Sequence, residues 1–182
     1  GEVSTGFYKH LLDQSLKFND DDAQYLTRTP ASASNRRTFT FSGWFKRGNI
    51  GTTQDIFIAG SNASGQLSTQ FTITSGNILQ VYSTISGSSA AILLQTTQVF
   101  RDVSAFYHVV LQVNTTDGTA SNRVKLYVNG EQVTSFSTAT YPSQNYDTAI
   151  NNNVIHTLGR FSVAAANHFD GYLSDINFVD GQ

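Results

Sequence analysis

Acidic residues are the first side chains in this sequence that could perform chemistry, because two carboxylates can cleave a glycosidic bond as an acid and base pair. The 182-residue chain has only two glutamates, Glu2 and Glu131, and they lie far apart in the sequence. Asp170 and Asp175 are five residues apart, so they would project from opposite faces of one strand. The acidic residues therefore do not predict a glycosidase site.

Other catalytic motifs are missing as well. No two glycines are four or two residues apart, which excludes a G-x-S-x-G nucleophile elbow and a G-x-G-x-x-G loop. There is no Gly-Lys pair for a P-loop and no cysteine. The four histidines, His10, His108, His156 and His168, are isolated and lack the spacing of zinc ligands. The sequence predicts that this domain is not an enzyme.

Aromatic rings among neutral polar side chains suit carbohydrate recognition better. Trp44 is out of phase with the phenylalanines of the predicted strand 38–46, so it should point away from the face that they bury. Tyr127 has the outward phase on its own strand, and Tyr82 is a third outward candidate. The sequence thus offers Trp44, Tyr82 and Tyr127 as sugar-stacking residues. The alternative for Trp44 is packing beneath a loop that covers the outer face.

These side chains must be positioned by β-strands, because apolar and polar residues alternate with a period of two from residue 15 onward. About eleven segments show the pattern: 24–28, 38–46, 54–59, 66–75, 78–85, 91–96, 105–114, 123–129, 131–136, 154–160 and 171–178. Asn129-Gly130 predicts a type I′ hairpin turn. Segments 138–148 and 151–153 are expected to be surface loops.

The phase shared by several strands also predicts the core. Apolar residues of one phase, with polar neighbours on the other, should be buried between two sheets. These residues are Phe41, Phe45, Val109, Leu111, Leu126 and Val128. Residues 15–182 are expected to form one all-β domain, preceded by an arm or short helix over residues 1–14. The first residue is Gly1 and not Met, which predicts a processed chain or an excised domain.

Composition limits the partners of the protein. Only 13% of the residues are charged and the formal net charge is −2, which excludes a nucleic-acid binder that works by neutralising phosphates. Hydrophobic residues make up 39% of the chain, enough to argue against disorder. No apolar run reaches the ~18 residues needed to cross a membrane. A folded domain with a neutral polar surface is expected.

Several segments in order resemble the laminin G-like, concanavalin A-like jelly rolls. The blocks are the opening SLKFNDDDAQYL of residues 15–26, the aromatic strand TFTFSGWFKR of 38–47, FYHVVL of 106–111, the hairpin VKLYVNGEQV of 124–133 and the closing FDGYLSDINF of 169–178. The detailed sequence, such as FVDGQ at 178–182, is similar to the corresponding segments of bacteriophage and marine-virus structural proteins.

The resemblance implies a two-sheet antiparallel jelly-roll sandwich in which the first and last strands are adjacent. It also implies a non-enzymatic module on the surface of a virion, in a tail fibre, spike or capsid, that binds carbohydrate on a host surface. The alternative function is a structural or decoration protein that contacts other virion subunits and binds no sugar. A homo-oligomer is compatible with either setting, although no heptad or collagen-like repeat encodes one.

A calcium ion is the one cofactor that the sequence suggests. Asn19-Asp20-Asp21-Asp22 places three carboxylates in four residues, where like charges repel and calcium would relieve the repulsion. If the first and last strands pair as the resemblance implies, Asp175 could approach Asp22 and complete the site. Asp22 and Asp175 are the expected ligands. The alternative is a solvated turn at 20–22 and a strand cap at Asp175.

Overall fold

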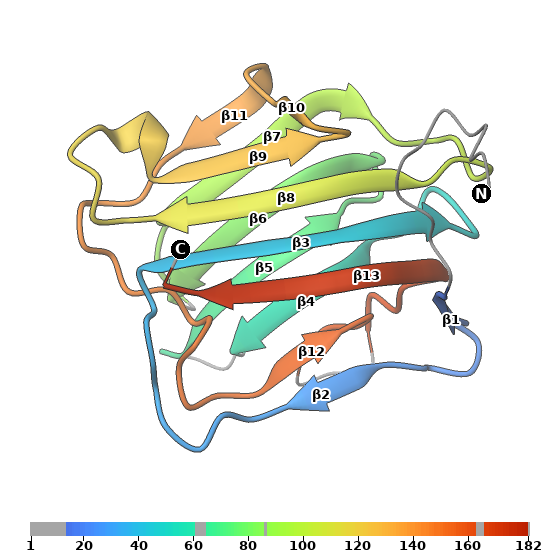
Figure 1. Cartoon of the computed structure of the whole chain (residues 1–182), viewed down its shortest axis with the longest axis horizontal. Coiled ribbons are helices and arrows are strands. Elements are labelled where there is room, and N and C mark those ends of the chain that lie inside the picture. The colour runs from blue at the N-terminus through green and yellow to red at the C-terminus, as the bar shows by residue number, and fades with distance from the viewer. Residues whose placement is uncertain (1–13, 61–64, 86, 163–165, 182) are drawn as a thin grey trace, which may run out of the picture.

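Alternating side chains build two antiparallel sheets that pack face to face in the computed structural model (Figure 1). The structure describes residues 14–60, 65–85, 87–162 and 166–181. Most of the arm expected over residues 1–14 lies outside these ranges. The described residues include one 3₁₀-helix, η1 (Ala120–Asn122), and no helix that is long and apolar enough to cross a membrane.

The first sheet, called sheet A here, has six strands within the described residues. In spatial order they are β1 (Leu16–Phe18), β13 (Gly171–Asp180), β3 (Thr38–Arg47), β8 (Tyr107–Asn114), β9 (Val124–Val128) and β10 (Glu131–Gln132). The first and last strands, β1 and β13, pair antiparallel with Leu16 opposite Leu173, as expected. Asn129 and Gly130 both have positive φ between β9 and β10, which confirms the predicted hairpin turn.

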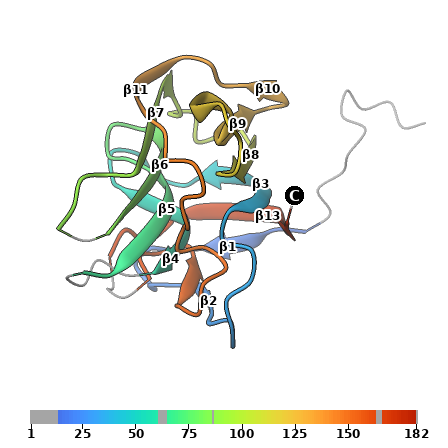
Figure 2. The same cartoon turned by 90° about the vertical axis from the view of Figure 1, so that its left-hand side faces the viewer.

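The second sheet, sheet B, has seven strands within the described residues and lies behind sheet A in Figure 1. In spatial order they are β11 (Phe136–Thr140), β7 (Ile92–Val99), β6 (Ile78–Ile85), β5 (Leu67–Ile73), β4 (Gln54–Gly60), β12 (His156–Leu158) and β2 (Leu26–Arg28). Figure 2 shows the two sheets from the side. The result is the expected all-β jelly-roll sandwich.

The inward phase of both sheets forms the core. The predicted core residues Phe41, Phe45, Val109, Leu111, Leu126 and Val128 are all buried, with at most 6% of their surface exposed. Phe41 of sheet A stacks on Phe57 of sheet B, with ring centroids 5.1 Å apart. This contact shows that the side chains of the two sheets interdigitate.

The strand expected over 131–136 and the surface loop expected over 138–148 differ from the structure. The expected strand 131–136 ends at Gln132, and the chain then leaves sheet A to start β11 in sheet B at Phe136. The expected surface loop 138–148 includes the end of β11 and a fully buried Thr148, whose hydroxyl donates to the carbonyl of Arg36. The short polar residues of this segment hid both features, because Ser and Thr occur in strands and loops alike.

Candidate functional site

A cleft of about 580 Å³ runs along the edge of the sandwich between β13 and β2. It exists because β1 pairs only with the first three residues of β13, which leaves the rest of β13 at the edge of sheet A. The edge of sheet B is formed by β2, which pairs with β12. The two edges lie next to each other without pairing, so the space between the sheets opens there. Its volume falls within the usual range for ligand sites.

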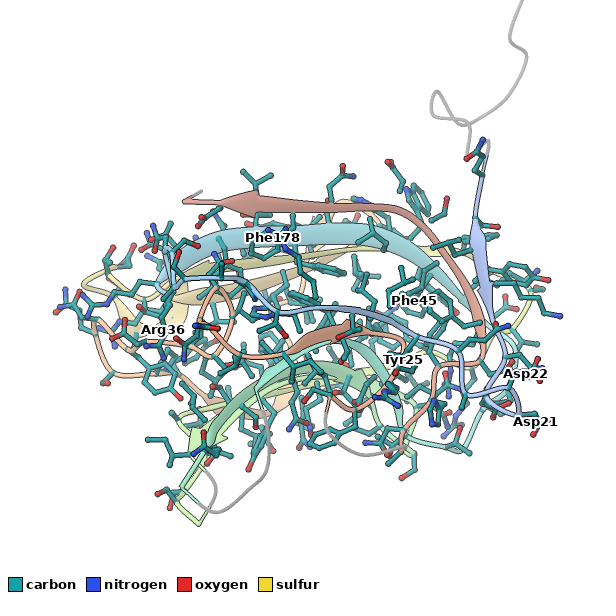
Figure 3. All side chains as sticks on the ribbon, turned by 90° about the horizontal axis from the view of Figure 1, so that it is seen from below. Asp21, Asp22, Tyr25, Arg36, Phe45 and Phe178 are labelled. Carbon is teal, nitrogen blue, oxygen red and sulfur yellow. The ribbon has the colours of Figure 1, made fainter. Side chains whose placement is uncertain are left out.

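Inward-facing side chains line both walls of the cleft. In sheet B, Leu26 and Arg28 of β2 lie opposite Leu158 and His156 of β12, in the phase that faces sheet A. In sheet A, Phe178 and Asp180 project from β13 in the phase of Phe41 and Phe39. Figure 3 shows Phe178 between the ribbons of β13 and β2.

A β-bulge turns Phe178 towards the cleft. The register of β13 against β3 shifts between Ser174 and Asn177, and Asp175 at the bulge has φ +49°. Because one extra residue reverses the side-chain alternation, Phe178 lies opposite Phe41; without the bulge it would lie opposite the outward Thr40. Ile176 fills the space above Gly43, where a Cβ atom would clash with it.

The floor of the cleft is aromatic. Phe178 is 38% exposed, and its ring lies 5.6 Å from that of Phe39 in a stacked arrangement. The same ring lies 5.9 Å from that of Phe57. Phe57 therefore belongs both to the core, through Phe41, and to the floor of the cleft.

Asn151 organises the polar rim. Its backbone N–H donates to Nε2 of His156 over 3.0 Å, and its side-chain amide donates to Oδ1 of Asp180 over 2.9 Å. Its carbonyl accepts the N–H of Ser34, which holds the loop between β2 and β3 over the cleft. Asn151 has φ +61°, a conformation that asparagine tolerates better than most residues. The predicted surface loop 151–153 is thus also a positioning element.

His156 is held in one neutral form. Nε2 accepts the N–H of Asn151, so the proton is on Nδ1, which lies 2.8 Å from the carbonyl of Val154 and donates to it. Burial lowers the pKa of His156, and the charge of Arg28 lowers it further, against the opposing effect of the Val154 carbonyl. Both ring nitrogens are therefore occupied, and the imidazole has no free lone pair to accept a proton.

The three predicted sugar-stacking residues lie elsewhere and are not brought together. Trp44 and Tyr127 are partly buried on the outer face of sheet A, where the ring of Trp44 lies 4.9 Å from that of His108. Tyr82 is partly buried on the outer face of sheet B, in register with Gln70 and Leu93. None of the three lines the cleft. The outward phase inferred for Trp44 matches its register opposite His108 and Ser174.

The two predicted calcium ligands are not brought together either. Asp175 is two residues beyond Leu173, the partner of Leu16, whereas Asp22 is four residues beyond Phe18 at the other end of β1. Asp22 lies with Asp21 in the turn at one end of the molecule (Figure 3) and accepts the amide of Asn19 over 2.8 Å. Among the described residues no group of three His, Cys, Asp or Glu could hold a metal ion.

Sequence reasoning missed the cleft, because its floor depends on the bulge and its rim on the long-range contacts of Asn151. The period of two predicted the closing strand, but it did not indicate the extra residue of the bulge within that strand. The run of three asparagines was the only local signal, and asparagine runs are also common in loops without a function.

The structure is thus a β-sandwich of two antiparallel sheets that enclose one core, with a cleft along one edge. The family model described as the "Concanavalin A-like lectin/glucanases superfamily" matches residues 20–182, and the chain belongs to this superfamily. No curated protein matches the sequence.

Solved structures share the fold at low sequence identity. Domains LG4–5 of the mouse laminin α1 chain align with a TM-score of 0.64 and 9% identity, covering 100% of this chain and 44% of that chain. The CBM40 of the Ruminococcus gnavus IT-sialidase, bound to α2,3-sialyllactose, has a TM-score of 0.57, 13% identity and coverages of 86% and 91%. The heptameric SAP-like pentraxin from Limulus polyphemus has a TM-score of 0.56, 19% identity and coverages of 85% and 68%.

Proposed function

We propose that this domain is a carbohydrate-binding module without catalytic activity and that the cleft between β13 and β2 is its binding site. One observation carries the proposal: an exposed aromatic ring, Phe178, lies in a ligand-sized cleft among polar side chains. The apolar face of a sugar ring can pack on the aromatic floor, while hydroxyls bond to the polar rim. A broad apolar patch would instead favour a structural interface.

The chemistry of the cleft favours binding over catalysis. Asp180 is the one carboxylate among the described residues that line it, and the neighbouring imidazole of His156 is neutral with both nitrogens occupied. Hydrolysis of a glycoside would need a second acidic group at a defined distance. Hydroxyl recognition needs only the donors and acceptors that the rim provides.

The biological setting of this proposal rests on the sequence resemblance to virus structural proteins. We place the module on a virion surface, where it would bind a glycan of the host. The similar fold of a sialidase CBM40 supports carbohydrate binding, and the similar fold of a heptameric pentraxin is compatible with a homo-oligomer. Contact with other virion subunits without sugar binding remains the competing function.

A glycan array with matched variants tests the site. Phe178→Ala should remove binding, because it deletes the exposed ring of the floor. Val179→Ala is the control, since Val179 is 43% exposed and is the next residue on the same strand but faces outward. Val179→Ala should bind like the wild type, and thermal melts should show that both variants fold.

Other outcomes would redirect or end the proposal. Loss of binding in Trp44→Ala or Tyr127→Ala, with Phe178→Ala unaffected, would move the site to the outer face of sheet A. The same result for Tyr82→Ala would move it to the outer face of sheet B. A wild-type protein that binds no glycan on the array would favour the purely structural function.

A further inference from the structure

Arg28 lines the cleft, but carbohydrate binding in general does not require a positive charge at this position. Its side chain has the inward phase of β2, opposite His156, and its residue lines the cleft and is exposed. Within the described residues its side chain makes no hydrogen bond or ion pair, although Asp180 lines the same cleft. The rim therefore presents a guanidinium whose donors are available to a ligand.

Three polar residues of the cleft near Arg28 already have hydrogen-bond partners within the protein. Both ring nitrogens of His156 are occupied, and the hydroxyl of Thr27 donates to the His156 carbonyl over 3.2 Å. The side-chain amide of Asn151 is shared between Asp180 and the carbonyl of Asn35. Arg28 is therefore the charged donor of the cleft that is available to a ligand, beside the neutral hydroxyls of Ser32 and Ser34.

We infer that the cleft selects a glycan with a single carboxylate-bearing sugar residue, which Arg28 holds through a two-pronged hydrogen bond. This inference rests on the proposed function. The planar guanidinium matches the two oxygens of a carboxylate in geometry and charge. Asp180 on the opposite wall can accept sugar hydroxyls, but it repels a second negative group. The site therefore favours a terminal uronate or sialate over a polysulfated chain.

The experiment compares acidic glycans with their neutral forms. The probes are 3′-sialyllactose and methyl β-glucuronide, each of which carries one carboxylate and is compared with its methyl ester, together with lactose and heparin, with affinities measured by titration calorimetry. At least one free acid should bind the wild type roughly tenfold or more tightly than its ester, because a hydrogen bond to a charged group is worth more than a neutral one. This preference should weaken as salt is added.

Variants separate the role of Arg28 from general binding. Arg28→Gln should reduce the affinity for the acid to that of its ester, and Arg28→Lys should fall between, because it keeps the charge but loses the planar fork. The control is Arg101→Gln, which removes an exposed positive charge from the chain between β7 and β8 and outside the cleft. It should retain the preference.

The outcomes distinguish the two proposals. Equal binding of acid and ester by the wild type, lost in Phe178→Ala, would overturn the inference and leave carbohydrate binding in place. A preference for the acid that survives in Arg28→Gln, or tightest binding to heparin, would also overturn it. Binding to none of the probes, with binding to neutral glycans on the array, rejects only the inference. Binding to no glycan at all rejects both.

Discussion

Asp55 is a carboxylate without solvent contact in a protein that has few charges. It lies on β4 and is fully buried, and it accepts hydrogen bonds from the Thr72 hydroxyl over 2.7 Å and the Asn167 amide over 3.1 Å. Burial raises the pKa of Asp55 to about 6, although both hydrogen bonds oppose the rise. The backbone N–H of Asp55 also donates to the carbonyl of Asn167, so the residue holds the chain between β12 and β13 against sheet B.

The raised pKa of Asp55 predicts a dependence of stability on pH. Between about pH 4 and 6 the folded protein holds a proton on Asp55 that the unfolded chain has lost, so this group's contribution to stability falls as pH rises through that window. The change is on the order of 3 kcal/mol, from a shift of roughly two pKa units. Asp55→Asn should remove it, because the amide does not titrate there.

Urea unfolding of the wild type and Asp55→Asn, each at pH 4 and pH 7.5, measures this effect. The wild type should gain stability relative to the variant on going to pH 4, and other titrating groups cancel in the comparison. Among these groups is His156, whose lowered pKa acts in the opposite direction. Parallel stability curves for the two proteins would contradict the assignment.

At the scale of elements, strand β9 shows how alternation sets stability. Leu126 is 1% exposed and lies opposite Leu111 of β8. Leu126→Ala should lower the free energy of unfolding by about 2–5 kcal/mol, because it leaves a cavity in the core. Gln112→Ala, at the next, outward-facing position of β8, is the control and should change stability by less than about 0.5 kcal/mol. A loss of less than about 0.5 kcal/mol for Leu126→Ala in denaturant melts would contradict this assignment of the inward face.

The alternation of apolar and polar residues predicted most strands, because a sheet with one buried face requires it. The prediction failed where a bulge adds a residue to a strand and breaks the period of two. Phe178 shows this limit: its sequence neighbours suggest a regular closing strand, yet the bulge at Asp175 decides which way its ring points. A bulge depends on the packing of Ile176 against Gly43, a contact between residues far apart in sequence. The position of the cleft could therefore not be inferred from local patterns.

For the whole molecule, the sequence predicted the sandwich and the adjacency of β1 and β13, because ordered blocks along the entire chain carried that information. It did not predict which residues would share a site. Trp44 and Tyr82 looked alike as outward aromatics, but they lie on opposite faces of the sandwich. Which faces meet a ligand depends on where the sheet edges open, and this is a property of the assembled sheets.

The predicted calcium ion can be tested at the acidic end of the molecule. Burial raises the pKa of Asp170 and the charges of Asp20 and Asp21 raise it further, so these carboxylates repel one another. Calcium that binds only the folded protein would raise its melting temperature relative to EDTA, and would add about 2.7 kcal/mol of stability at a hundredfold excess over Kd. Asp175→Asn should leave this rise unchanged, because Asp175 lies at the other end of β1. Superimposable melting curves with calcium and with EDTA would show that the folded protein binds no calcium.

Phe57 belongs both to the core and to the floor of the cleft, so the floor and the rim of the cleft face different constraints during evolution. Since its ring stacks on Phe41 in the core, Phe57 cannot be replaced without a loss of stability. The rim is different: Arg28 and the loop at residues 30–34 are mostly exposed, and their side chains can be exchanged at little cost to folding. New ligand preferences can therefore arise by mutation of the rim alone, on a scaffold whose floor stays fixed.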